Sequence, residues 1–146
     1  MTRIILPVVV ASLCLATWAA AHSGVKNLNV LERMEAMKVT QENTKVLGAM
    51  AKGERAFDIE EAQAAAAEIA RLARKTPALF EAQEMDANSE ALPVIWEQFD
   101  DFTGKSLALQ AAAKTLSISI ETEADLRAGL GRIGAACKAC HKVYRK

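Results

Sequence analysis

The chain has 146 residues, enough for one domain, and its 18 basic and 18 acidic side chains leave no net charge. This balance excludes the basic excess that nucleic-acid-binding proteins usually show. About half of the residues are hydrophobic, but only 5% are aromatic, and alanine and leucine dominate. Because alanine and leucine favour helices whereas β-sheets favour β-branched and aromatic side chains, the composition predicts an all-α protein.

Residues 1–21 have the three parts of a secretory signal peptide. Arg3 provides a positive charge, residues 4–16 are almost wholly apolar, and Ala19–Ala21 match the small-residue cleavage pattern. We therefore expect cleavage before His22 and export to the periplasm. The mature domain is then residues 22–146.

An uncleaved membrane anchor is the alternative for this segment. Residues 4–21 approach the roughly 20 apolar residues that cross a bilayer. Pro7 inside the run and the alanine triplet at its end favour cleavage instead. Cys14 would leave with the signal, so the mature chain would hold two cysteines and a net charge near −1.

Two helices are predicted in the first half of the mature chain from apolar residues three and four positions apart. The first covers about residues 29–51 and ends at Gly53. Thr40 and Thr44 occupy inward positions in its polar middle. The second helix covers about residues 58–75, with Asp58 as its N-cap and Pro77 ending it.

An irregular connection, residues 76–91, separates these helices from two more, and Leu79 and Phe80 are expected to fold back there as a lid. The third helix is predicted to start at Pro93, because proline is tolerated in a first turn. Thr122 opens the last helix, where Asp125 follows as a near capping box. Four amphipathic helices with mostly short loops predict an antiparallel four-helix bundle.

Cys137-Lys138-Ala139-Cys140-His141, near the C-terminus, matches the attachment signature of c-type haem. On a helix these cysteines and the histidine share one face within little more than a turn. Two thioethers can then form to the haem vinyl groups while the imidazole of His141 reaches the iron. The motif predicts one covalent haem c, with His141 as the proximal iron ligand.

Two other uses of such a motif have less support in the sequence. A thioredoxin-like redox pair belongs at the start of a helix in a βαβ unit, and no strand pattern is present. A structural zinc site needs four ligands, and the only other histidine is His22.

The position of the haem motif, five residues from the C-terminus in the last of four helices, resembles the cytochrome c′ family, the class II c-type cytochromes. The resemblance covers the whole mature chain. Its segments are, in order, Lys52-Gly53-Glu54 with Phe57-Asp58, Pro93-Val94-Ile95-Trp96, and Cys137 to His141 followed by Tyr144-Arg145.

The resemblance also indicates what lies on the face of the haem iron opposite His141. High-spin members of the family leave that face vacant and bind nitric oxide or carbon monoxide, whereas low-spin members of the cytochrome c-556 type place a methionine sulfur there. Matching the first helix to the family places Arg33 where a basic residue approaches a haem propionate and Met37 at the deciding position. The chain therefore resembles the low-spin branch. Met34, one turn earlier, is the rival ligand, and spacing alone favours Met37 as a core residue.

Ligation by both His141 and Met37 would close the site to substrates and suit outer-sphere electron transfer. We therefore expect an electron carrier and not an enzyme. Binding of nitric oxide or carbon monoxide by a five-coordinate iron is the alternative function.

A basic rim near the haem motif favours an acidic redox protein as partner, docking by transient, salt-sensitive encounters. The rim consists of Lys138, Lys142, Arg145 and Lys146. The same residues also complement the dipole at the end of a helix, and the two explanations are compatible. A monomer and a homodimer are both compatible with the alanine-rich helix faces.

Overall fold

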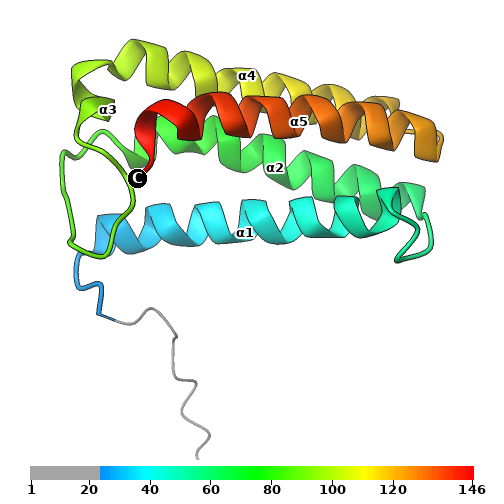
Figure 1. Ribbon diagram of the computed structural model, residues 1–146, viewed down its shortest axis with the longest axis horizontal. Coiled ribbons are helices and arrows are strands. Elements are labelled where there is room, and N and C mark those ends of the chain that lie inside the picture. The colour runs from blue at the N-terminus through cyan, green and yellow to red at the C-terminus, as the bar shows by residue number, and fades with distance from the viewer. Residues whose placement is uncertain (1–23) are drawn as a thin grey trace, which may run out of the picture.

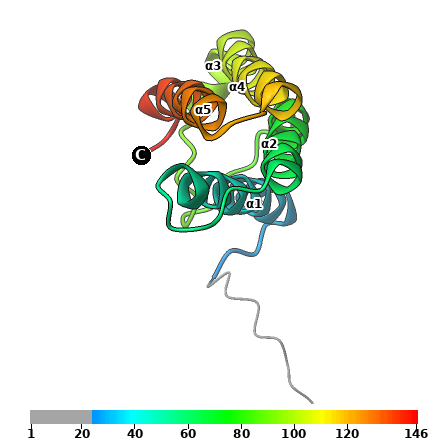
Figure 2. The ribbon, with the colours of Figure 1, turned by 90° about the vertical axis from the view of Figure 1, so that its right-hand side faces the viewer.

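A computed structural model describes residues 24–146 as a bundle of helices. The helices are α1 (Leu28–Ala51), α2 (Ile59–Leu79), α3 (Val94–Glu97), α4 (Phe99–Ser119) and α5 (Glu123–Tyr144). The four long helices, α1, α2, α4 and α5, lie side by side around a common axis (Figures 1 and 2). No strand occurs in this part of the chain, so the prediction of an all-α antiparallel four-helix bundle is confirmed. The predicted signal peptide, residues 1–21, lies outside the described residues.

Polar side chains fix where the long helices begin. Asn27 and Asp58 each accept a hydrogen bond from a first-turn amide of α1 and α2, at 3.0 and 2.9 Å. Thr122 and Asp125 form a complete capping box at the start of α5, as predicted. Gly53, at φ +72°, takes the left-handed conformation just after α1 and confirms the predicted end of that helix.

Pro77 does not end α2, and this prediction was wrong. The helix continues through Pro77 to Leu79. A proline at this position removes the amide that would bind the carbonyl of Ala73, one turn earlier. The hydroxyl of Ser106 on α4 donates a 2.7 Å hydrogen bond to that carbonyl instead. The interhelical bond supplies the lost partner, so the proline is accommodated in the last turn.

The predicted third helix is broken into two helices at Gln98, where the backbone leaves the helical region at φ −126° and ψ 41°. Pro93 is the N-cap of the short α3 and precedes its first turn. Four buried side chains on both sides of the break form an aromatic-rich cluster: Phe80, Ile95, Phe102 and Tyr144. The ring centre of Phe102 lies 4.9 Å from that of Phe80 and 5.4 Å from that of Tyr144. This aromatic packing offsets the hydrogen bonds that the backbone loses at the break.

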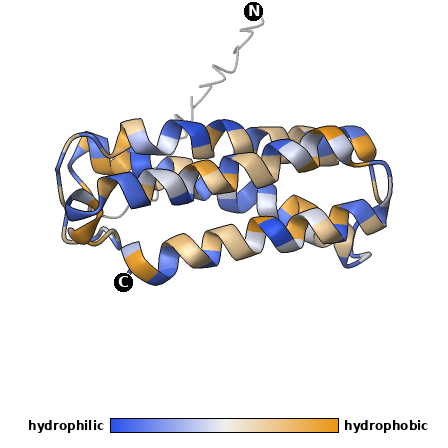
Figure 3. Cartoon of the chain, turned by 90° about the horizontal axis from the view of Figure 1, so that it is seen from above, coloured by the Kyte–Doolittle hydropathy of each residue, from blue (hydrophilic) through white to orange (hydrophobic). Residues whose placement is uncertain are grey.

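The main core lies towards the other end of the bundle, where all four long helices contribute fully buried aliphatic residues. Its largest members are Leu47, Met50, Ile69, Leu116, Ile120, Leu126 and Ile133. Each such side chain contributes about 1.5–3 kcal/mol on leaving water. Polar residues separate the apolar positions along each helix (Figure 3). The neighbours of α2 approach it closely at buried alanines, among them Ala62, Ala65, Ala66 and Ala73.

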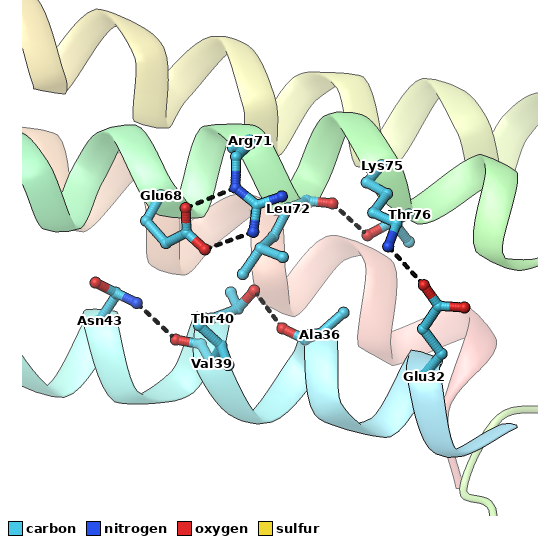
Figure 4. A network of polar contacts seen from close by, with 10 residues as sticks. All are labelled: Glu32, Ala36, Val39, Thr40, Asn43, Glu68, Arg71, Leu72, Lys75 and Thr76. Carbon is cyan, nitrogen blue, oxygen red and sulfur yellow. Dashed lines mark hydrogen bonds and ion pairs between the residues drawn. The ribbon is translucent and has the colours of Figure 1, made fainter. Parts of the chain in front are cut away.

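Polar side chains on α1 and α2 bind mainly their own helix or the facing one (Figure 4). Thr40 is buried, as predicted, and its hydroxyl donates to the carbonyl of Ala36 at 2.8 Å. The ammonium group of Lys75 on α2 lies 2.5 Å from the carboxylate of Glu32 on α1. These contacts satisfy polar groups within α1 and between α1 and α2.

Candidate haem-binding site

A cavity of about 1080 Å³ lies between α1 and α5, with α4 and the segment after α2 also contributing to its wall. Figure 1 shows why these elements meet: the last turns of α5 and the first turns of α1 lie at the same end of the bundle. The site residues predicted from sequence all line this cavity, three from α5 and two from α1: Cys137, Cys140, His141, Arg33 and Met37. The fold therefore brings together residues that are about 100 positions apart.

Cys137 and Cys140 are half-buried, and neither is in a disulfide. Removal from water raises the pKa of both thiols, because burial disfavours the charged thiolate. Lys105 on α4 opposes part of this shift at Cys140. The two sulfur atoms are therefore uncharged groups that face an enclosed space.

His141 follows on the same face, and its side chain remains exposed. Partial desolvation lowers the pKa of its imidazole, and the positive charge of Arg145 lowers it further, against a smaller opposing effect of Glu90. The neutral form therefore predominates at pH 7. This is the form that has a nitrogen lone pair to offer a metal.

Two methionines on α1 line the same cavity. Met37 and Met34 are one turn apart and both half-buried. The wall continues with Thr40 and Thr44, whose hydroxyls each donate at 2.8 Å to a carbonyl of α1 one turn earlier. Both threonines therefore occupy inward positions, as the sequence predicted.

Arg33 is also in the cavity wall, and only 3% of it is exposed. Its guanidinium group donates to the backbone carbonyls of Leu79, Ala82 and Glu84, with distances of 2.7 Å to the first and the last. Its contact with a haem propionate stays a prediction. The hydrogen bonds to the segment after α2 were missed, because backbone acceptors leave no signal in a sequence.

We call residues 80–93, between α2 and α3, the α2–α3 connection. Residues 144–146, at the end of α5 and just after it, bind this connection. The amide of Leu92 donates to the carbonyl of Tyr144 at 3.0 Å, and the amide of Lys146 donates to Glu90 at 2.9 Å. Arg145 forms an ion pair with Glu90. Phe80, the predicted lid residue, is buried and lines the cavity.

Basic side chains outnumber acidic ones around the cavity. Six arginine or lysine residues line it: Arg33, Lys38, Lys45, Lys52, Lys105 and Arg145. The acidic residues of the lining are Glu54 and Glu90. This excess of positive charge suits a ligand with carboxylate groups.

The donor set fits a covalently attached haem. Two thiols at the required spacing, a neutral imidazole and a thioether on the facing helix open onto one large cavity with a basic margin. Haem carries two vinyl groups, one iron and two propionates, and each has a matching group here. Within residues 24–146 no cluster of three or more His, Cys, Asp or Glu residues could hold a metal ion.

The sequence model described as "Cytochrome C'" matches residues 29–145, almost the whole described chain. The chain belongs to the cytochrome c′ family. Like the proteins of this family it binds one covalent haem c.

Relatives with two different names support this membership. A cytochrome c′ of Rhodopseudomonas palustris is 39% identical over 80% of each chain. A cytochrome c-556 of Agrobacterium tumefaciens is 37% identical over 68% of this cytochrome and 81% of its own length. The solved structure of cytochrome c′ from Rhodopseudomonas palustris superimposes with a TM-score of 0.77 at 36% identity, covering 83% of this chain and 98% of that one.

Proposed function

We propose that this cytochrome is a mono-haem electron carrier of the periplasm and not an enzyme. Cys137 and Cys140 form the thioethers, His141 is the proximal iron ligand, and Met37 is the distal ligand. One observation carries the proposal: a methionine of α1 and the histidine of α5 line the same cavity from two neighbouring helices. The proposal includes a contact between Arg33 and a haem propionate.

The haem supplies the one-electron chemistry, and the residues of the chain hold it and close both faces of the iron. The low pKa of His141 keeps its ligating nitrogen free of a proton at pH 7. A thioether such as that of Met37 is a soft ligand that favours the reduced metal and raises the potential. With both positions filled, no group of the chain needs to move a proton or an atom.

Export is part of the proposal and rests on the signal-like residues 1–21. No helix within residues 24–146 is long and apolar enough to cross a membrane. A cleaved signal would release the whole bundle into the periplasm, where it would carry electrons between redox proteins.

The basic rim proposed for docking divides into two pairs. Arg145 is bound to Glu90, and the ammonium group of Lys146 donates to the carbonyl of Ser89 at 2.9 Å. Lys138 and Lys142 are exposed and have no ion-pair partner in the described chain. We therefore assign attraction of an acidic redox partner to Lys138 and Lys142 within this rim.

Binding of nitric oxide or carbon monoxide is the second candidate function. The relative from Rhodopseudomonas palustris has the name cytochrome c′, which the high-spin branch also bears. Thr44 and Gln41, which line the same cavity, would then supply polar groups near a bound gas molecule.

Absorption spectra of the holoprotein test the choice between these functions. Oxidised and reduced samples are recorded with and without carbon monoxide. An electron carrier with two protein ligands gives low-spin spectra that carbon monoxide leaves unchanged. A high-spin spectrum that shifts with carbon monoxide would establish an open distal position and make gas binding the function.

A further inference from the structure

The lysines of α1 gather on the side of the helix that faces the cavity. Lys38, Lys45 and Lys52 are seven residues apart, close to two helical turns, so they form one stripe along the helix. All three are exposed and all three line the cavity that contains His141. The stripe continues from the predicted haem position to the end of α1.

The acidic residues of α1 lie elsewhere on the helix. Glu32, Glu35 and Glu42 do not line the cavity. Glu32 instead binds Lys75 on α2. The charged residues that α1 contributes to the wall of the cavity are therefore all basic.

Nearby carboxylates neutralise this stripe only in part. Lys38 has Glu35 at 3.7 Å and Lys52 has Glu54 at 3.9 Å, with all four side chains about half or more exposed. Such exposed pairs stabilise the fold little, and their lysines remain available to other anions. Lys45 has no ion-pair partner among the described residues.

We infer that Lys38, Lys45 and Lys52 form a docking surface for the carboxylate groups of an acidic redox protein. This inference rests on the proposed electron-carrier function. It keeps the acidic redox partner proposed for Lys138 and Lys142 and adds the face of α1 that also receives it. The stripe lies along the margin of the cavity from the α1 side, so a partner bound there would cover the cavity opening. Long-range attraction by aligned charges raises the rate of encounter and is screened by salt.

A triple variant with Lys38→Gln, Lys45→Gln and Lys52→Gln tests the surface, because glutamine keeps helix propensity while removing the charge. The matched control is Arg74→Gln, Lys114→Gln and Arg132→Gln, which removes the same charge from exposed sites away from the cavity. Each reduced holoprotein is oxidised by ferricyanide, which is anionic, and by tris(phenanthroline)cobalt(III), which is cationic.

At low ionic strength the stripe variant should react with ferricyanide about tenfold more slowly than wild type and with the cobalt complex faster, and the differences should vanish in high salt. The control triple should change both rates much less. If the two triple variants changed both rates equally, net charge alone would explain the result and the inference would be overturned.

Binding of poly-L-glutamate gives a second readout that does not depend on electron transfer. Backbone amide shifts of the reduced holoprotein should change along residues 38–52 and not around Lys114. Shifts spread over all basic residues, or none along α1, would overturn the docking surface. Absorption spectra of the same samples report iron ligation, so failure of the Met37 proposal and failure of the docking surface are seen separately.

Discussion

The guanidinium carbon of Arg33 lies 4.5 Å from the ring centre of Phe80. The Trp96 ring centre is 5.7 Å away, and three backbone carbonyls accept hydrogen bonds from the same group. Burial lowers the pKa of Arg33, and Glu84 opposes this. Backbone carbonyls and aromatic faces hold this buried charge, so Arg33 fastens the α2–α3 connection to α1.

Replacing Arg33 should destabilise the protein strongly. Arg33→Met loses three charge-assisted hydrogen bonds and leaves carbonyls unpaired, so we expect a loss of about 2–4 kcal/mol in the free energy of unfolding. Arg33→Lys should recover little, since one ammonium group cannot reproduce the planar fork. Urea unfolding of the holoproteins measures both. The exposed Lys38→Met is the control and should change stability by less than about 0.5 kcal/mol. An Arg33→Met protein as stable as that control would show that the contacts carry no energy.

Ser106 and Pro77 should be energetically coupled through the carbonyl of Ala73. Ser106→Ala leaves that buried carbonyl without a donor and should cost about 1–2 kcal/mol. In a Pro77→Ala background the restored amide can bind the same carbonyl, so Ser106→Ala should cost about 1 kcal/mol less. Thermal or urea unfolding of the four proteins completes the cycle, and strictly additive effects would refute the shared acceptor.

Gly129 is needed for close packing of α5 on α4. A Cβ atom at this position would lie 2.1 Å from a methyl carbon of Leu116. Gly129→Ala should therefore destabilise by about 1–3 kcal/mol through overpacking. Gly131→Ala, two residues on, meets open space and should instead stabilise by a few tenths to about 1 kcal/mol. Similar melting temperatures for the two variants would contradict this packing.

Tyr144 should ionise at unusually high pH. Its ring is buried, and its hydroxyl donates a 2.6 Å hydrogen bond to the exposed carboxylate of Asp101. Desolvation and then this bond raise the pKa of Tyr144 to about 12. Because the folded pKa is above the ordinary value of about 10, stability from the neutral phenol is complete below pH 10 and is lost as pH rises towards 12.

The chain has a single tyrosine, so tyrosinate absorbance titrates this group alone. Asp101→Asn should lower the midpoint by removing the negative acceptor. A wild-type midpoint near 10 would show that the phenol is solvated and not held by Asp101.

Local signals in the sequence predicted much of the fold. Helix ends could be predicted at Asp58, Thr122 and Gly53. Each of these residues interacts with, or bends, only the adjacent turn of backbone, so its effect can be read locally. The haem motif needed only helical spacing to put its residues on one face. Its position opposite Arg33 and Met37 of α1 came from the resemblance to the cytochrome c′ family.

Contacts between distant residues account for what the sequence could not predict. Pro77 stays in a helix because of a hydroxyl on α4, and Arg33 is bound by carbonyls about 50 positions away. The break at Gln98 follows from packing of the aromatic cluster and has no glycine or proline at the break itself to mark it. Met34 and Met37 both line the cavity. Neither their spacing in the sequence nor their place in the cavity wall decides which of them binds the iron, so experiment must decide.

Replacement of each methionine in the holoprotein tests the central claim most directly. The oxidised wild type should show the weak far-red band of sulfur bound to ferric iron. Met37→Ala should lose this band, become high-spin and bind carbon monoxide when reduced, while Met34→Ala keeps the wild-type spectrum. Retention of the band in Met37→Ala, or its loss in Met34→Ala alone, would contradict Met37 ligation.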